Sequence, residues 1–277
     1  MGSRRLSVTS SPLAFYEAHG GQPAAPDMPE QPLVLGHALG SDRRMWDEVI
    51  APLPSSVRVI LWEQPGHGQS DLLHVDGGAS LSVGDIADSL HAGLTELDVI
   101  GGDAAPIVGG LSLGGMVSLA FGEQYPDDLS ALLMFSSGAV LEPSSAWFER
   151  AAVVQSRGLE PLVEGTMERW FSERFAGGPG VEAIARTRQT FLATDPAGYA
   201  QCCLAIAGTD LRPEAGVLRV PLFLTVGEDD PGMTPGDARA FAGLVPQATV
   251  NVIPGAKHMT AVEDPEAEAD AIRALKS

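Results

Sequence analysis

The sequence predicts an α/β fold with a mostly parallel central sheet flanked by helices and a helical cap inserted into it. Short apolar runs of β type alternate with segments of helical spacing along most of the 277 residues. A Gly-x-Ser-x-Gly segment at residues 110–114 lies between one such run and a helical pattern. Residues 141–215 break the alternation, with helical material and no clear strand. We therefore predict a core at 1–140 and 216–277 and a cap at 141–215.

Apolar runs and helical periodicity give the expected elements of the core in order. The N-terminal segment predicts a hairpin around Ser11 and Pro12, formed by strand-like runs near Val8 and at 15–17, and residues 20–31 predict a loop. A helix is expected at 82–97, where apolar side chains share one face. Buried strands are expected at 33–35, 57–62, 106–110, 131–135, 222–226 and 248–253. Further helices are expected at 113–125, 236–244 and 263–276.

Composition argues against several classes of partner. The net charge of −19 would repel nucleic acid and anionic membrane surfaces. We see no apolar region of a signal peptide, and no window approaches the roughly 18 apolar residues of a membrane span. The adjacent Cys202 and Cys203 cannot form a disulfide framework and accompany no metal pattern. We therefore expect a cytoplasmic protein with no metal, no cofactor and no nucleic-acid or membrane partner, and a homo-oligomer remains open.

The strongest candidate for a catalytic residue is Ser112, within Gly110-Leu111-Ser112-Leu113-Gly114. A strand before this segment and a helix after it form the context of a nucleophile elbow, a turn so tight that glycine is needed at the flanking positions. A serine at this turn would face a cleft, with a helix N-terminus beneath it. The alternative is a glycine-rich turn that carries an ordinary serine.

A serine nucleophile needs a general base, and the base needs a carboxylate that orients it. His258 follows the last expected strand and precedes the last helix, which would place it at the same sheet edge as Ser112. Asp230 follows the preceding strand, and Asp229 is the competing acid. Each of these residues could instead belong to a solvated loop.

The oxyanion of a tetrahedral intermediate needs backbone N–H donors. We expect one donor from Leu113, at the start of the elbow helix, and the other from Leu39, in the loop after the 33–35 strand. His37 is expected to organise that loop and to border the substrate pocket. Residues 63–70 would form a tight supporting loop beside the site.

The motifs in this order resemble those of the α/β-hydrolase superfamily, over about residues 13–275. They are His-x-x-Gly-Ser at 37–41, Pro-Gly-His-Gly-x-Ser at 65–70, Gly-Leu-Ser-Leu-Gly-Gly at 110–115, and Gly-x-x-Asp at 227–230 with a late histidine. A finer similarity to 3-oxoadipate enol-lactonases covers residues 39–42, 45–46, 158–164, 168–171, 198–206 and 210–212. The chain departs from those lactonases at His37-Ala38 and at residues 231–235.

The resemblance implies an α/β-hydrolase fold and a serine hydrolase that acts through an acyl-enzyme on Ser112. Its substrate would be a small lactone or ester, most of all an enol-lactone such as 3-oxoadipate enol-lactone. The competing functions on the same triad are a carbon–carbon bond hydrolase, a cofactor-free peroxidase-like hydrolase and a general carboxylesterase. A non-catalytic ligand-binding protein is the alternative from another class.

A substrate that carries a free carboxylate would need a cation in the pocket, because an unpaired buried charge is costly. Three arginines are candidates for this cation, each with a surface salt bridge as its alternative: Arg44, Arg169 and Arg212. Trp46 and Trp170 would wall the pocket, or would belong to the core.

Overall fold

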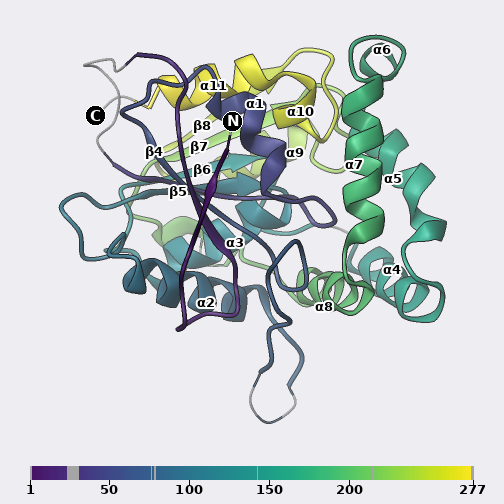
Figure 1. Ribbon diagram of the computed structural model, residues 1–277, viewed down its shortest axis with the longest axis horizontal. Helices are drawn as coiled ribbons and strands as arrows, with labels where there is room; N and C mark the ends of the chain where they lie inside the picture. The colour runs from purple at the N-terminus through teal and green to yellow at the C-terminus, as the bar shows by residue number, and fades with distance from the viewer. Residues whose placement is uncertain are drawn as a thin grey trace.

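The computed structural model of the protein describes residues 2–23, 31–75, 77, 79–141, 143–213 and 215–275 (Figure 1). Its centre is an eight-stranded sheet with the strand order β1-β2-β4-β3-β5-β6-β7-β8. β2 pairs antiparallel with both β1 and β4, and all other neighbours are parallel. The strands are β1 (Arg4–Leu6), β2 (Phe15–His19), β3 (Leu33–Gly36), β4 (Arg58–Trp62), β5 (Ile107–Leu111), β6 (Ala131–Phe135), β7 (Leu222–Gly227) and β8 (Ala248–Ile253).

Helices cover both faces of the sheet, as a parallel sheet requires. In Figure 1, α2 and α3 lie on one side of the strands and α1 and α11 on the other. The core helices are η1 (Arg43–Trp46), α1 (Asp47–Ile50), α2 (Val83–Glu96), α3 (Leu113–Gln124), η4 (Ala215–Val217), α9 (Pro235–Ala242), α10 (Thr260–Glu263) and α11 (Pro265–Arg273). α3 is buried on nearly all of its surface, which explains why its sequence is apolar without a polar face.

Further helices lie between β6 and β7 in the chain and gather beside one end of the sheet (Figure 1). They are α4 (Ser144–Arg157), η3 (Glu160–Leu162), α5 (Val163–Trp170), α6 (Glu173–Ala176), α7 (Val181–Ala193) and α8 (Pro196–Ala207). α4 and α8 pack against each other. We call residues 144–207 the cap segment; the division of the chain into a core and a cap domain stays a prediction.

The expected elements of the core are present, with two adjustments. The first strand of the N-terminal hairpin is Arg4–Leu6, so Val8 lies in the connection. The helix expected at 263–276 is α11, which begins at Pro265, and the short helix α10 before it was not expected. Of the loop expected at 20–31, residues 24–30 lie outside the described residues.

The parallel strands bring their carboxyl ends to one edge of the sheet, which is where α/β proteins place their ligands. β3, β5, β7 and β8 each end there and continue into the loops that hold the candidate residues. Among the described residues, no helix has both the length and the apolar character needed to cross a membrane.

Candidate active site

Ser112 lies on the sharp turn between β5 and α3, in an unusual backbone conformation. Its φ of 56° and ψ of −115° are rare for a residue with a side chain, and such strain often accompanies a functional site. A Cβ at Gly114 would lie 2.4 Å from the Gly36 carbonyl oxygen of β3, so only glycine lets the elbow helix approach the sheet this closely. Ser112 itself is 5% exposed.

His258 and Asp230 form a buried hydrogen-bonded pair. Nδ1 of His258 lies 2.9 Å from Oδ2 of Asp230, and the other carboxylate oxygen accepts from the N–H groups of Gly232 and Met233. Burial alone would raise the pKa of Asp230, but His258 and the two N–H groups hold it below its ordinary value. The carboxylate is therefore ionised at neutral pH and fixes the proton of His258 on Nδ1. Asp229, the competing acid, is exposed to solvent, whereas Asp230 is the carboxylate that pairs with His258.

Ser112 and His258 line one cavity of about 250 Å³. Residues from the sheet edge and from the cap segment complete it: Leu39, Leu141, Pro143, Ala146, Trp147, Arg150, Arg169, Trp170, Tyr199, Pro231 and Gly232. The structure records no hydrogen bond between Ser112 Oγ and His258, and such bonds are often long in unliganded enzymes.

Of the two residues expected to supply oxyanion donors, Leu39 lines this cavity, and Leu113 directly follows the lining residue Ser112. Leu113 is the first residue of α3, so its N–H has no acceptor within the helix. The aligned peptides of α3 also make this end of the helix electropositive. Leu39 lines the cavity from the loop that follows β3. The arrangement can therefore offer two backbone donors to one developing negative charge.

His37 does not border the cavity, which corrects the expectation for its side chain. It is fully buried, donates from Nδ1 to the Ala38 carbonyl at 2.8 Å, and accepts the Gln64 N–H at Nε2 at 3.0 Å. Burial lowers the pKa of His37 and keeps the imidazole neutral. The side chain makes hydrogen bonds within and beside its loop from a buried position, and not from the cavity wall.

The two tryptophans have different surroundings. Trp46 is fully buried, and its ring packs 5.3 Å from that of Phe135, so it belongs to the core and not to the pocket wall. Trp170 lines the cavity, and its ring packs edge-to-face on Phe171 and Phe191. Trp170 is at the C-terminal end of an amphipathic cap helix, whereas Trp46 closes the short turn that leads into α1.

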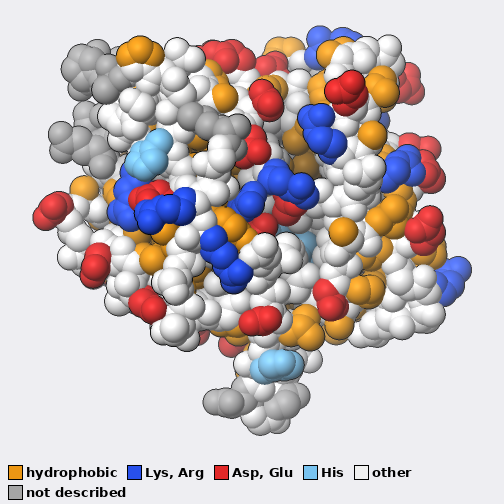
Figure 2. All heavy atoms as spheres, in the orientation of Figure 1, with side chains coloured by type: hydrophobic (Ala, Val, Ile, Leu, Met, Phe, Trp, Pro, Cys, Tyr) orange, Lys and Arg blue, Asp and Glu red, His pale blue; other side chains and the backbone are white. Residues whose placement is uncertain are grey.

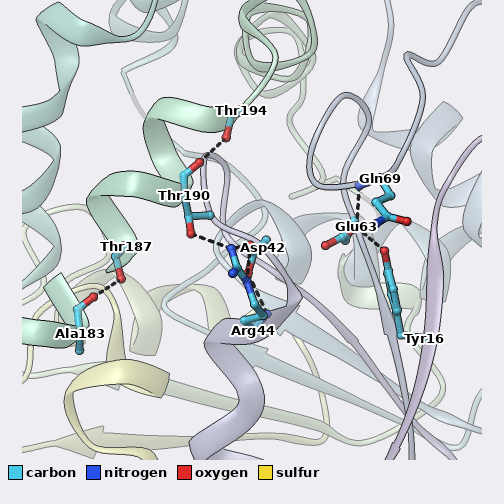
Figure 3. A network of polar contacts seen from close by, with 9 residues as sticks. All are labelled: Tyr16, Asp42, Arg44, Glu63, Gln69, Ala183, Thr187, Thr190 and Thr194. Carbon is cyan, nitrogen blue, oxygen red and sulfur yellow. Dashed lines mark hydrogen bonds and ion pairs between the residues drawn. The ribbon is translucent and has the colours of Figure 1, made fainter. Parts of the chain in front are cut away.

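Of the three candidate arginines, only Arg169 lines the cavity. Arg44 lies outside the cavity lining, where it pairs with Asp42 and reaches Thr190 of α7 at 3.1 Å (Figure 3). Arg212 pairs with Asp210, two residues away in the sequence. Arg44 and Arg212 therefore form ion pairs near the surface, which is the alternative that the sequence analysis gave for each of them.

Arg150 of α4 is a lining residue that the sequence analysis missed. Its Nε donates to the Tyr199 hydroxyl at 2.5 Å, and another guanidinium nitrogen donates to Thr166 at 2.6 Å. No carboxylate among the described residues forms an ion pair with Arg150 or Arg169. A signal was available, because Trp147 and Arg150 are three apart in a helix and share a face.

Burial and the nearby charge of Arg150 lower the pKa of Arg169, against the attraction of Tyr199 and Asp230. Two cations thus share one cavity in a protein that carries a net charge of −19. Figure 2 shows acidic and basic side chains interspersed over one face of the molecule, so basic side chains are present on this face despite the acidic net charge.

Cys202 and Cys203 are buried on α8 and unreactive as they stand. Burial raises the pKa of both thiols, that of Cys203 to about 12. Within the described ranges, no group of three or more His, Cys, Asp or Glu side chains is placed to hold a metal ion.

A family model described as the alpha/beta hydrolase family matches residues 33–271. 3-Oxoadipate enol-lactonase 1 of Acinetobacter baylyi is 29% identical over 234 residues, which cover 84% of each chain. 3-Oxoadipate enol-lactonase 2 of the same organism is 25% identical over 279 residues, covering 97% of this chain and 95% of the relative.

Solved structures are similar over nearly the whole chain. A thermophilic esterase from Thermogutta terrifontis, with malate bound, has a TM-score of 0.83 and 26% identity, covering 99% of this chain and 97% of that one. The enol-lactonase from Burkholderia xenovorans LB400 has the same fold, with a TM-score of 0.82, 24% identity and 97% coverage of each chain.

Proposed function

From the premise that this chain belongs to the alpha/beta hydrolase family, we propose that it is a serine hydrolase of small carboxylate-bearing lactones or esters. The names of its relatives support an enol-lactone, such as 3-oxoadipate enol-lactone, as the substrate. The observation that carries the proposal is the shared cavity. It joins Ser112 and His258 on the sheet edge to Arg150 and Arg169 on the cap segment.

In the proposed reaction, Oγ of Ser112 attacks the carbonyl carbon while Nε2 of His258 takes its proton. Asp230 keeps the other imidazole proton on Nδ1 and stabilises the imidazolium that forms. The N–H groups of Leu39 and Leu113 stabilise the oxyanion, and each donor is worth about 3 kcal/mol in comparable hydrolases.

Collapse of the intermediate breaks the bond from the acyl carbon to the ring oxygen and leaves an acyl-enzyme. With an enol-lactone, the oxygen leaves as an enolate, so its departure needs little help from an acid. The enolate then takes up, through solvent, the proton that Nε2 of His258 received from Ser112, and becomes a ketone on protonation at carbon. His258 is then neutral and can act as a base again. The ring-opened product stays attached through its acyl group. Water then attacks the ester, gives its proton to His258, and releases a carboxylic acid and free Ser112.

The cations of the cavity support a substrate that carries a free carboxylate besides the lactone or ester group. An arginine without a protein carboxylate can bind one from a ligand in a charge-assisted, bidentate manner. Arg150 is already held in place by Tyr199 and Thr166, which lowers the entropic cost of that binding. The related Thermogutta esterase was solved with malate, a dicarboxylate.

The experiment compares the wild type with Ser112→Ala on a panel of lactones and esters, with and without a free carboxylate. NMR identification of the products shows which bond is cleaved. We expect acid release from an enol-lactone by the wild type and at least about a 10⁴-fold loss in Ser112→Ala. Undiminished turnover by that variant would exclude Ser112 as the nucleophile. Cleavage of a diketone but not of a lactone would favour a carbon–carbon bond hydrolase instead.

A further inference from the structure

Two buried histidines exchange hydrogen bonds between the loop of Leu39 and the loop at residues 63–70. Nε2 of His37 accepts the N–H of Gln64 at 3.0 Å. In return, Nε2 of His67 accepts the N–H of Gly40 at 2.9 Å. The two rings lie 5.3 Å apart, and each loop thus supplies the acceptor for a backbone donor of the other.

The same histidines hold the peptide units on both sides of Leu39. Nδ1–H of His37 donates to the Ala38 carbonyl at 2.8 Å, and the Ser41 N–H donates to the same oxygen at 3.0 Å. That carbonyl belongs to the peptide whose N–H is the proposed oxyanion donor of Leu39. Since a trans peptide is planar, fixing its C=O on one side aims its N–H to the opposite side.

His67 fixes the next peptide, between Leu39 and Gly40. Gly40 has a φ of +81°, and a Cβ there would lie within 3 Å of the rings of Phe191 and Tyr199 in the cap segment. Rotation of this peptide would break the bond to His67, and the close approach of those rings leaves no room for a side chain at Gly40. The Leu39 N–H is therefore fixed through its own peptide, by His37 and Ser41, and through the next peptide, by His67.

The His67 loop is itself anchored on two sides. The buried Glu63 accepts from the Tyr16 hydroxyl at 3.0 Å and from the Gln69 N–H at 2.9 Å (Figure 3). On the side of the cap segment, the His67 ring stacks on Tyr199, with centroids 6.4 Å apart. His67 therefore has little freedom to follow a moving oxyanion loop.

We propose that His67 is a positioning residue for the oxyanion hole, and that it acts with His37 to aim the Leu39 N–H into the cavity. The inference rests on the proposed function, because it takes Leu39 as an oxyanion donor. The role requires that Nε2 of His67 carries no proton. Nδ1 donates to the Pro65 carbonyl at 2.9 Å, which fixes that tautomer. Burial, with a smaller effect of His37, lowers the pKa of His67 to about 3, so the acceptor persists at neutral pH.

A matched pair of variants tests the acceptor without emptying the site. His67→Gln places an amide oxygen near the position of Nε2, whereas His67→Met fills a similar volume with a poor acceptor. We expect kcat/KM for p-nitrophenyl acetate to fall about 10- to 100-fold in His67→Met, since misplacement by about 1 Å costs up to 10²-fold. His67→Gln should recover most of this loss. His91→Met, on α2 and outside the cavity lining, is the control and should stay within about twofold.

The second readout is the inhibition constant of a trifluoromethyl ketone, whose adduct with a serine resembles the oxyanion. It should rise in His67→Met by the same factor by which kcat/KM falls. An inhibition constant is independent of the fraction of enzyme that folds, so loss of folded protein alone would leave it unchanged. An unchanged constant, or equal behaviour of the Gln and Met variants, would overturn the role of His67. Activity in Ser112→Ala would instead overturn the proposed function.

The wild-type enzyme gives a third test that needs no variant. Nitrogen-15 NMR of labelled histidine should show the Nδ1–H tautomer for His67, with no titration between about pH 5 and 9. Protonation at Nε2, or titration near neutral pH, would refute the proposal even if neither variant folds.

Discussion

The carboxyl edge of the sheet and the cap segment contribute to one cavity by different physical means. The sheet edge uses backbone geometry: a serine on a strained turn, a helix N-terminus and N–H groups held by buried neutral histidines. The cap segment contributes side chains from amphipathic helices, including Trp170 and the charged Arg150 and Arg169.

The polar groups of the two regions also differ in their partners. Asp230 is bound by His258 and two backbone N–H groups, and the paired histidines bind each other's loops. Arg150 and Arg169, in contrast, have no ion pair with a described carboxylate. A polar group whose hydrogen bonds are made within the protein is preorganised for chemistry. A cation with no carboxylate partner in the protein can instead bind the anionic group of a ligand. In the proposed function, this difference assigns the reaction to the sheet edge and the choice of substrate to the cap segment.

The largest test of this division is Asp230→Asn. An amide cannot hold the Nδ1–H tautomer of His258 as the carboxylate does, so we expect kcat to fall about 10⁴-fold on any substrate. KM should change far less. The matched control is Asp229→Asn, one residue away and exposed, which should keep kcat within about twofold. Steady-state kinetics with one neutral and one carboxylate-bearing ester measures both. A fall in kcat confined to one substrate would break the division.

Arg150→Gln tests the cap segment and should act on KM. A hydrogen bond to a charged group is worth about 1.5–3 kcal/mol, so KM for a carboxylate-bearing ester should rise about 10- to 100-fold. The neutral ester of the same length should change by less than about threefold. Arg212→Gln, which alters a guanidinium outside the cavity lining, is the control. Equal losses on both esters would mean that Arg150 supports the fold of the cavity and does not read the substrate.

The same division explains what the sequence could predict. The positions of Ser112, Asp230 and His258 were predictable because each follows a strand, and parallel strands bring their ends together. Asp230 could be chosen over Asp229 because it lies three residues after Gly227, far enough into the turn for its side chain to point back to the site. In contrast, the spacing of Trp147 and Arg150 places them on one helix face, but only the packing of helices shows that this face lines the cavity and that Arg44 lies outside it. Helix α7 meets Arg44 at Thr190, whereas α8 brings Tyr199 to Arg150 in the cavity wall.

Glu268 extends the comparison, because it is a core acid without an ion pair among the described residues. It is fully buried on α11, and the Thr260 hydroxyl acts on it without forming a hydrogen bond of good geometry to either carboxyl oxygen. Burial, helped by the charge of Asp264 and opposed by the Thr260 hydroxyl, raises its pKa to about 8. Thr260, which acts on this carboxyl, follows the proposed base His258 by two residues.

The sign of the pH effect follows from this raised pKa. The folded protein holds a proton on Glu268 that the unfolded chain loses near pH 4.5. The stabilisation is complete below that pH and is lost as the pH rises to about 8, at up to about 1.4 kcal/mol per pH unit. Glu268→Gln should remove this slope in chemical denaturation between pH 5 and 8, with kcat/KM at pH 7 nearly unchanged. Glu266→Gln, exposed on the same helix, should retain the slope, and a slope that persists in Glu268→Gln would refute the assignment.

The smallest expected effect belongs to Arg44, which joins the two regions outside the cavity. Its pair with Asp42 and its bond to Thr190 link η1 to α7 (Figure 3). The Arg44 side chain is 62% exposed, and exposed ion pairs contribute about 0–1 kcal/mol to stability. Arg44→Gln should therefore lower the melting temperature only slightly and change kcat/KM by less than about twofold on both esters. A selective rise of KM for the carboxylate-bearing ester would contradict this. It would mean that a cation beyond the cavity wall also guides the substrate, and that the cap segment selects along an approach path as well as at the site.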